Sequence, residues 1–222
     1  MKKLMTATVL AAGLVGGAAS AAVVETTFTL SGNSSPSNGF SLSSGGLTAG
    51  VTGKSVTSVN LSGTTITSLN GLSNEKVGRY SEGAGVTSYN GDDHTVDGSG
   101  TNDLIQLVFS SAVQIVSASF GYFGWQDDFR YMVDTDGNGL DNGDYMSAEM
   151  DVVNPFTNFA NLSSKTWAFA AFGDNDSWKL KSVTVRYDDG ISIDPDPVPL
   201  PASGLLLLGG LGALVMRRRK AA

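Results

Sequence analysis

The chain has 222 residues, no cysteine, a single histidine and a formal net charge of −7 at pH 7. The absence of cysteine excludes disulfides, thiolate metal centres and cysteine-based catalysis, and the single histidine excludes metal sites that need two or three imidazoles. The length is enough for one domain with a sizeable core.

The N-terminus has the parts of a secretory signal peptide. Lys2 and Lys3 precede an apolar stretch from Leu4 to Ala18, and residues 19–21, Ala-Ser-Ala, form an A-x-A cleavage site. A short apolar stretch that ends in small residues is typical of a removed signal and not of a first membrane span. We therefore expect residues 1–21 to be a signal peptide that signal peptidase cuts after Ala21 or the next alanine.

Residues 22–193 are predicted to form short strands separated by turns rich in Gly, Asn, Asp and Ser. Val23–Leu30 alternates between apolar and polar residues as a first strand. Ser31–Gly50 is predicted to be a loop, because it is rich in Ser, Gly and Asn. Ser55–Leu61 and Thr64–Leu69 are predicted to pair as a hairpin about an intervening glycine.

The strongest strand signals are Leu104–Phe109 and Val113–Phe123. The second carries apolar residues on both faces, which indicates a strand buried between layers. The later predicted strands are Phe129–Val133, Tyr145–Val152, Thr166–Phe172 and Trp178–Tyr187. In the last of these the apolar phase shifts by one residue, so we expect a β-bulge near Lys181-Ser182. Many short strands, with no sustained helical period outside the termini, predict an all-β domain: a single antiparallel, jelly-roll-like β-sandwich.

The densest group of oxygen-bearing side chains is Asp134, Asp136, Asn138, Asp141 and Asp144. Oxygen ligands at alternate positions, with glycines between them, suit Ca²⁺, and the pattern D-x-D-x-N-G matches the first half of an EF-hand loop. The second half departs from that loop, because Tyr145 stands where a bidentate Glu is needed. The sequence predicts these five residues as a candidate calcium site with Asp144 as the substitute ligand, and the alternative is a plain Asp/Asn/Gly turn.

His94 lies in a second acidic segment that runs from Asp92 to Asp97. An imidazole beside carboxylates can act as a general base or as a metal ligand. No nucleophile motif accompanies this histidine, which argues against a Ser-His-Asp arrangement. We expect His94 to be a solvated loop residue.

Sugar binding and sugar hydrolysis are alternatives for a β-sandwich that contains several aromatic residues. The aromatic residues that could stack on sugar rings are Trp125, Trp167, Trp178 and Tyr131. Tryptophans in a sandwich, however, more often belong to the core. Asp127 and Asp128 are adjacent and should point to opposite faces, so they cannot form the facing carboxylate pair that glycoside hydrolysis needs.

The C-terminus consists of consecutive blocks. Residues 194–197, Asp-Pro-Asp-Pro, are predicted to be a stiff, extended linker. The motif that follows is Val198, Pro199, Leu200, Pro201 and Ala202. Its prolines fix φ, so no helix should cross it, whereas the apolar run Gly204–Met216 can form a short transmembrane helix. The cations that end this run and stop its transfer are Arg217, Arg218, Arg219 and Lys220.

These C-terminal blocks resemble the VPLPA variety of PEP-CTERM sorting signal, which occupies residues 198–222. Proteins with such signals are substrates of exosortases, membrane-embedded cysteine proteases of Gram-negative bacteria. The resemblance implies transient residence in the inner membrane, cleavage near the Pro-rich motif, and delivery to the cell surface or release. Leu200 stands where the commonest form of the signal has Glu. A plain single-span anchor is the alternative, but Leu200–Met216 is 17 residues long, at the bottom of the range needed for a hydrocarbon core of about 30 Å.

Further segments are similar to exosortase-dependent surface proteins: Asp93–Asp97, Leu104–Phe109 and Gly173–Leu180. In that group an HTVD segment precedes a strand that ends in Phe, and a late D-x-S-aromatic-K-L segment closes the domain. The resemblance implies a secreted, surface-associated domain without an established catalytic role.

Removing both ends changes the charge of the chain. Two of the 14 basic residues lie in the signal peptide and four in the tail, whereas all 21 acidic residues lie between them, so the mature part carries −13. A surface this acidic repels nucleic acid and anionic lipid but suits cations and neutral sugars. We therefore expect a non-catalytic, calcium-binding surface or matrix protein with exopolysaccharide or surface glycan as partner; the alternative is a carbohydrate-binding module or carbohydrate-active enzyme.

Overall fold

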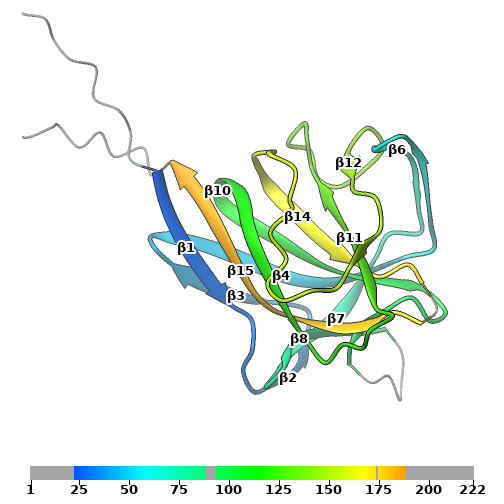
Figure 1. Ribbon diagram of the computed structural model, residues 1–222, viewed down its shortest axis with the longest axis horizontal. Coiled ribbons are helices and arrows are strands. Elements are labelled where there is room, and N and C mark those ends of the chain that lie inside the picture. The colour runs from blue at the N-terminus through cyan, green and yellow to red at the C-terminus, as the bar shows by residue number, and fades with distance from the viewer. Residues whose placement is uncertain (1–22, 89–93, 174, 189–222) are drawn as a thin grey trace, which may run out of the picture. The chain divides into compact units, whose positions relative to one another are not determined.

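The computed structural model describes residues 23–88, 94–173 and 175–188 (Figure 1). Within these ranges the chain is all-β, with fifteen strands and no helix. Among the same residues there is consequently no helix long and apolar enough to cross a membrane. The signal peptide, the 194–197 linker, the Val198–Ala202 motif, the transmembrane helix and the basic cluster all lie outside the described residues.

The strands are β1 (Val23–Thr29), β2 (Ser34–Ser37), β3 (Phe40–Ser44), β4 (Leu47–Val56), β5 (Ser58–Ser62), β6 (Thr65–Asn70), β7 (Ser73–Tyr80), β8 (Gly83–Thr87), β9 (Val96–Asp97), β10 (Asn102–Gly121), β11 (Asp128–Val133), β12 (Tyr145–Met146), β13 (Met150–Asp151), β14 (Ser164–Ala170) and β15 (Ser177–Asp188). Their pairings are all antiparallel and link them in the order β1-β15-β8-β7-β4-β10-β14-β11-β12-β6-β5. The remaining strands join this path from the side, and β10 also pairs with β15.

Strand β10 is the longest strand and connects two parts of this network. Its first half, up to Phe109, pairs with β4 and β14, whereas its second half, from Gln114, pairs with β15. The sequence predicted two separate strands here, Leu104–Phe109 and Val113–Phe123. The chain instead continues through the intervening Ser-Ser-Ala, with a register shift between Val108 and Val113 where β10 changes partners.

Strand β15 contains the bulge that the sequence predicted. Ser182 pairs with Ser119, but Leu180 already pairs with Phe120, so Lys181 is the additional residue. A bulge restores the inward phase of the strand after one extra residue. Leu180 and Val183 on either side are therefore both fully buried.

The prediction that Ser31–Gly50 is a loop is wrong, because β2, β3 and the start of β4 lie there. Leu47, Ala49 and Val51 point inward at alternate positions and are buried, although the residues between them are small or polar. Gly45 and Gly46 form the two-residue turn between β3 and β4, with φ of 58° and 85°. Positive φ at both turn residues matches the twist of a hairpin and favours glycine.

Other expectations are met in part. The hairpin of Ser55–Leu61 with Thr64–Leu69 is present as β5 and β6. The single predicted strand Tyr145–Val152 is replaced by the short strands β12 and β13, which both pair with β11. Strands β7 and β8 were not predicted. The sequence of β8 gives little strand signal, because it is mostly glycine, alanine and threonine around one valine.

The core is rich in aromatic rings that pack around Phe129, at the start of β11. Its ring centroid lies 4.7 Å from that of Phe120 and 4.9 Å from that of Phe156. Trp178 packs edge-on against Phe120 at 5.2 Å. Burying apolar area of this kind is the main stabilising term of a domain without disulfides. Because Phe129 is fixed in this cluster, β11 holds the loops at both of its ends in place.

Candidate functional site

Two loops that each contain a buried aspartate and a glycine lie at the two ends of β11. Residues 134–144 follow the strand and contain the predicted calcium ligands, and residues 122–127 precede it and contain Trp125. Each loop is built on carboxylates that accept hydrogen bonds from backbone N–H groups. The two loops are described in turn.

In the 134–144 loop the structure brings together Asp134, Asp136 and Asp144. One carboxylate oxygen from each lies within 4.8 Å of the others. Asp134 and Asp144 are only 4% and 1% exposed, whereas Asp136 is exposed to solvent. Three carboxylates this close together repel one another unless protons or a cation are shared between them.

The two buried carboxylates also organise the loop backbone. Asp134 accepts N–H groups of Gly137 at 2.6 Å and Gly139 at 3.1 Å. Asp144 accepts the N–H groups of Thr135 and Asp141, both at 2.8 Å. The chain can turn tightly around Asp134 because Gly137 and Gly139 have φ of 85° and 107°.

The other two predicted ligands are placed differently. The side-chain amide of Asn138 donates to Asp136 Oδ2 at 2.8 Å, so it lies beside the exposed member of the group. Asp141 is exposed, its carboxylate does not belong to the group of three, and its contribution is the backbone N–H given to Asp144. The structure thus assembles three of the four predicted aspartates, with Asn138 at the edge.

Hydrogen bonds to strand β6 hold the loop on the domain. Ile66 N–H donates to the carbonyl of Asp144 at 2.8 Å, and Gly143 N–H donates to the carbonyl of Ile66 at the same distance. Leu69 N–H donates to the side-chain carbonyl of Asn142 at 2.9 Å. The loop that carries the carboxylates is therefore fixed before any ligand arrives.

The electrostatics of the loop disfavour an unneutralised charge at Asp144. Burial raises the pKa of Asp144 above its ordinary value of 3.8, hydrogen bonds from Thr135 and Asp141 lower it, and the negative charge of Asp134 raises it further. A buried carboxylate with raised pKa gains most from a positive charge placed beside it. The arrangement can hold a divalent cation through oxygen ligands alone.

The 122–127 loop uses its carboxylates differently. Asp127 accepts the N–H of Gly124 with Oδ2 and that of Ser177 with Oδ1, the latter at 3.1 Å. Asp176, on the neighbouring segment, accepts the N–H groups of Asp128 at 2.9 Å and Gly173 at 2.7 Å. Both oxygens of Asp127 and both oxygens of Asp176 are occupied by backbone donors, so these residues shape the loop.

Only one of the four aromatic residues named as sugar-stacking candidates is accessible. Trp125 is 91% exposed, whereas Trp167, Trp178 and Tyr131 are buried in the core. The buried rings also satisfy their polar atoms; Trp178 Nε1, for example, donates to the carbonyl of Asp128 at 3.0 Å. The sequence did not single out Tyr122, which is exposed next to Trp125 because β10 ends at Gly121 and the predicted strand does not continue to Phe123.

His94 is partly buried and not a solvated loop residue, so that expectation is wrong. Its ring stacks on the ring of Tyr80 with centroids 5.4 Å apart and an interplanar angle of 4°. Its Nδ1 lies 2.7 Å from Thr87 Oγ1. Its backbone has φ of 58°, the left-handed conformation. Asp92 and Asp93, which stood beside it in the predicted acidic segment, lie outside the described residues.

The segments behind the second resemblance are adjacent in space. Strand β9, Val96–Asp97, pairs with Ser177 and Trp178 at the start of β15. Thr95 donates to Asp97 Oδ2 at 3.2 Å and receives a hydrogen bond from Ser177 Oγ at 3.1 Å. Residues 95–97 are buried, so in this chain the segment supports the base of the 122–127 loop.

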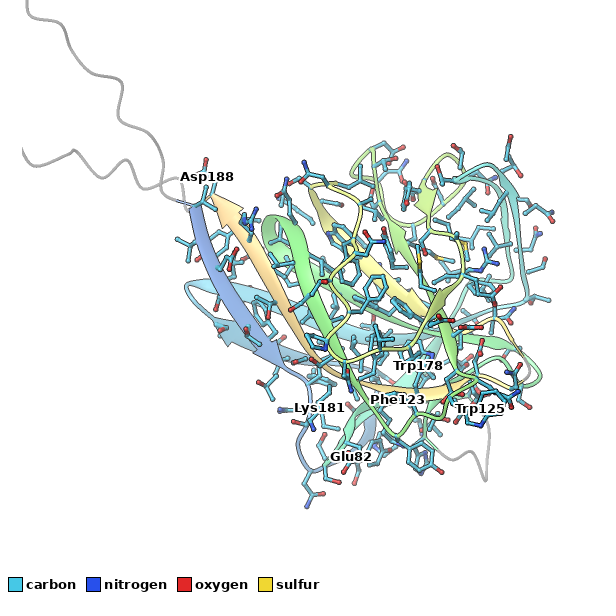
Figure 2. All side chains as sticks on the ribbon, viewed as in Figure 1. Glu82, Phe123, Trp125, Trp178, Lys181 and Asp188 are labelled. Carbon is cyan, nitrogen blue, oxygen red and sulfur yellow. The ribbon has the colours of Figure 1, made fainter. Side chains whose placement is uncertain are left out.

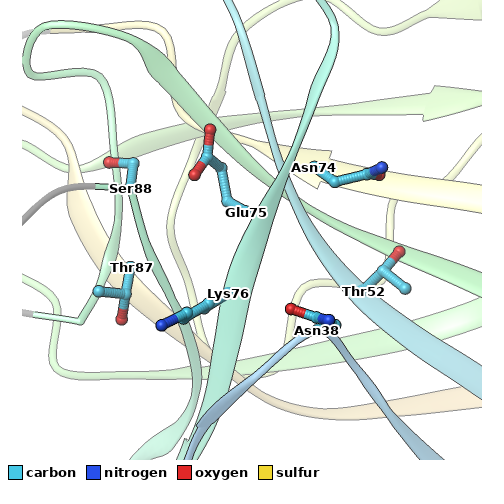
Figure 3. Close-up of a pocket in the computed structure, with 7 residues that line it drawn as sticks. All are labelled: Asn38, Thr52, Asn74, Glu75, Lys76, Thr87 and Ser88. Atoms are coloured by element: carbon cyan, nitrogen blue, oxygen red, sulfur yellow. The ribbon is translucent and has the colours of Figure 1, made fainter.

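A cavity of about 780 Å³ lies beside strand β7 (Figure 3). The residues that line it are all polar: Asn38, Thr52, Asn74, Glu75, Lys76, Thr87 and Ser88. Several of these side chains pair with one another or with nearby residues, as Glu75 does with Ser55 at 2.8 Å and Asn74 with Lys54 at 2.8 Å. With no aromatic or aliphatic hydrophobic residue among those that line it, the cavity offers a ligand no ring or hydrophobic side chain to pack on.

Comparison with protein-family models, with curated proteins and with solved structures finds no match to this chain.

Proposed function

We propose that the chain is an exported, non-catalytic cell-surface or matrix protein whose single domain binds one Ca²⁺ at Asp134, Asp136 and Asp144. The observation that carries the calcium site is the convergence of three carboxylate oxygens within 4.8 Å, two of them on nearly inaccessible side chains. Ca²⁺ takes six to eight oxygen ligands in flexible geometry, so water, Asn138 or backbone carbonyls could complete a site with three carboxylates. A set of ligands made only of oxygen also argues against zinc or copper.

We propose further that the all-β domain is a single antiparallel β-sandwich. What supports this is strand β10, whose two halves pair with different neighbours, and the extensive aromatic and aliphatic core that the strands enclose. A strand that passes from one sheet to the other at a bend is the usual way to join two packed sheets.

Export is proposed from the sequence of the two termini. The resemblance of residues 198–222 to VPLPA-type sorting signals supports processing by an exosortase after transient insertion in the inner membrane. The A-x-A site at residues 19–21 supports cleavage by signal peptidase. The protein would then reach the surface of a Gram-negative bacterium or the exopolysaccharide around it.

The calcium proposal is tested by thermal unfolding of the protein in millimolar CaCl₂ and in NaCl of equal ionic strength. A ligand that binds only the native state stabilises it by about 2.7 kcal/mol at a hundredfold excess over its Kd, a rise of several degrees in Tm. Asp136→Asn should abolish the rise, because Asp136 is an exposed member of the carboxylate group whose loss leaves the buried hydrogen bonds intact.

Asp141→Asn is the matched control. It removes one negative charge from the same loop, but Asp141 lies outside the carboxylate group, so the calcium-dependent rise should persist. Equal shifts in CaCl₂ and NaCl, or equal losses in the two variants, would mean that calcium only screens charge, and the loop would then be a plain turn.

The sorting proposal is tested by mass spectrometry of the mature protein. Replacing Pro199 and Pro201 by Ala should leave an uncut precursor in the inner membrane, because the prolines keep the cleavage motif out of the helix. Deleting residues 204–222 should release the domain without membrane retention. A double proline variant that matures to the parental mass would refute exosortase processing.

A further inference from the structure

Three exposed aromatic side chains gather in the loop that leads into β11. Trp125 is 91% exposed, Tyr122 57% and Phe123 39%. Figure 2 shows Phe123 and Trp125 at the lower edge of the domain in this view, with Trp178 further inside. Soluble domains seldom leave a tryptophan this exposed, and aromatic residues at a surface usually contact a ligand or partner.

The exposure of Trp125 belongs to a fixed loop. The carboxylate of Asp127 accepts the N–H of Gly124 and that of Ser177, the first residue of β15. The side-chain amide of Asn175 donates to the carbonyl of Gln126 at 3.0 Å. These hydrogen bonds hold Gly124 and Gln126, the residues before and after Trp125 in the sequence. A loop ordered in advance loses little conformational entropy when it binds, which is the condition for a binding site made from few side chains.

Tyr122 is fixed by a second set of contacts. Its backbone has φ of 51°, a conformation that costs free energy in any residue other than glycine. Lys179 Nζ lies 4.4 Å from the centre of its ring and 5.3 Å from that of Tyr80, on which His94 stacks. The cation holds the Tyr122 ring against the domain. Strained, over-determined backbone of this kind is found where a side chain is presented for a purpose.

A cavity of about 410 Å³ opens beside these rings, lined by Tyr122, Phe123, Gly124, Asp127 and Ser177. This volume is in the range of small-ligand sites. Its walls combine flat apolar rings with polar atoms, which is the composition that a pyranose needs: the C–H face of the sugar packs on the ring and its hydroxyls meet polar groups at the edge.

We propose that the 122–127 loop binds uncharged pyranose chains, with Tyr122 and Phe123 lining the cavity and the exposed ring of Trp125, which is not among the residues that line it, as a stacking platform outside it. The net charge of −13 on the mature part argues against polyanionic ligands and anionic lipid, because both would be repelled. Lys179, the cation that lies over the rings of Tyr122 and Tyr80, is only 7% exposed, so it is not presented to a phosphate headgroup. The loop binds without cleaving, since Asp127 is the one carboxylate among the described residues lining the cavity, and both of its oxygens accept N–H groups.

The proposal is tested by affinity electrophoresis of the full chain through gels that contain a neutral polysaccharide, such as glucomannan, laminarin or xylan, or the polyanion alginate. At least one neutral polymer should retard the protein and alginate should not. Trp125→Ala should weaken the retardation at least tenfold, and Trp125→Tyr should keep part of it. Because Trp125 packs against so little of the domain, its substitution should leave Tm unchanged.

Val108→Ala is the matched control, since Val108 is also an exposed apolar residue, 45% exposed, but lies on β10 away from the loop. It should migrate like the parent. Retardation by no neutral polymer, equal retardation by alginate, or undiminished retardation of Trp125→Ala would each overturn the proposal. So would Trp125-dependent dimerisation or binding to lipid vesicles in place of sugar binding. Asp136→Asn should be retarded like the parent, so failure of the calcium site leaves this test intact.

Discussion

The two loops at the ends of β11 are held by the same kind of hydrogen bond but present different surfaces. In both, buried aspartates accept backbone N–H groups and thereby fix a glycine-containing turn. After β11, Asp134 and Asp144 lie close enough to form one group of oxygens with Asp136. Before β11, Asp127 and Asp176 each serve separate backbone donors, and the side chains that reach solvent are aromatic. The two loops thus differ in what they present: three clustered carboxylates after β11 and exposed aromatic side chains before it.

The largest effects are expected from removing the acceptors that build each loop. Asp144→Ala would leave the N–H groups of Thr135 and Asp141 without their acceptor, and Asp127→Ala would do the same to Gly124 and Ser177. Each variant loses two part-buried hydrogen bonds worth about 0.5–1.5 kcal/mol each, so denaturant unfolding without calcium should show losses of about 1–3 kcal/mol in both variants.

The two losses should differ in their response to calcium. Asp127→Ala should retain the full calcium-dependent rise in Tm, whereas Asp144→Ala should lose it. If both variants lost the rise, the loops would be coupled through β11 and could not be regarded as separate sites.

A smaller effect is expected from pH. The pKa values of Asp128, Asp144 and Asp176 are raised, in each case mainly by burial. A raised native pKa means that the folded state binds the proton more tightly than the unfolded chain. The contribution of these groups to the free energy of unfolding should therefore grow as pH falls through their native pKa values toward the ordinary value of 3.8, and it is lost again as pH rises through the native pKa values.

Calcium distinguishes the contribution of Asp144 to the pH dependence of stability from the contributions of Asp128 and Asp176. A bound cation favours the ionised form of Asp144, so its share of the pH dependence should disappear in saturating CaCl₂, while the shares of Asp128 and Asp176 remain. Thermal unfolding at several pH values with CaCl₂ or with EDTA measures this difference. The Asp144→Asn variant should show no difference between the pH dependence measured in CaCl₂ and that measured in EDTA. If the pH profiles of the parent in CaCl₂ and in EDTA ran parallel, the calcium site would be contradicted.

Much of the sheet could be predicted from apolar alternation, because β1, β11, β14 and β15 carry large side chains at every second position. The phase shift that predicted the bulge at Lys181 is a local property of the sequence, and it was confirmed. The Leu47–Val51 segment was missed because its inward residues alternate with Thr and Gly in a region where small polar residues dominate. There the tertiary environment, and not residue size, selects the strand.

The candidate site was predicted less completely. Spacing alone named Asp134, Asp136 and Asp144, but it also named Asp141, whose carboxylate lies outside the group of three and whose backbone N–H donates to Asp144. Strand β10 ends at Gly121, just before Tyr122 with φ of 51° and a turn in which Asp127 accepts the N–H of Gly124, and the local apolar pattern does not encode this turn. The sequence did not distinguish the exposed Trp125 from the buried Trp178, because each tryptophan follows a small residue, Gly124 or Ser177.

The smallest effect is expected at His94. His94→Ala removes the stack on Tyr80 and the contact with Thr87, so we expect a loss of about 1 kcal/mol in thermal or denaturant unfolding. The change should slightly weaken sugar retardation, because Tyr80 supports Lys179 and through it Tyr122, but calcium binding should be unaffected. If the free energy of unfolding of His94→Ala stayed within about 0.2 kcal/mol of that of the parent, the stack on Tyr80 would contribute nothing measurable to stability.

Isothermal titration of the full chain with CaCl₂, in buffer freed of divalent ions, tests the calcium site most directly. The parent, Asp141→Asn and Trp125→Ala should each show one saturable site with the same Kd, because none of these changes touches the three clustered carboxylates. Asp136→Asn should bind at least tenfold more weakly. The absence of saturable binding in the parent, or an Asp136→Asn variant that binds as tightly as the parent, would contradict the calcium site.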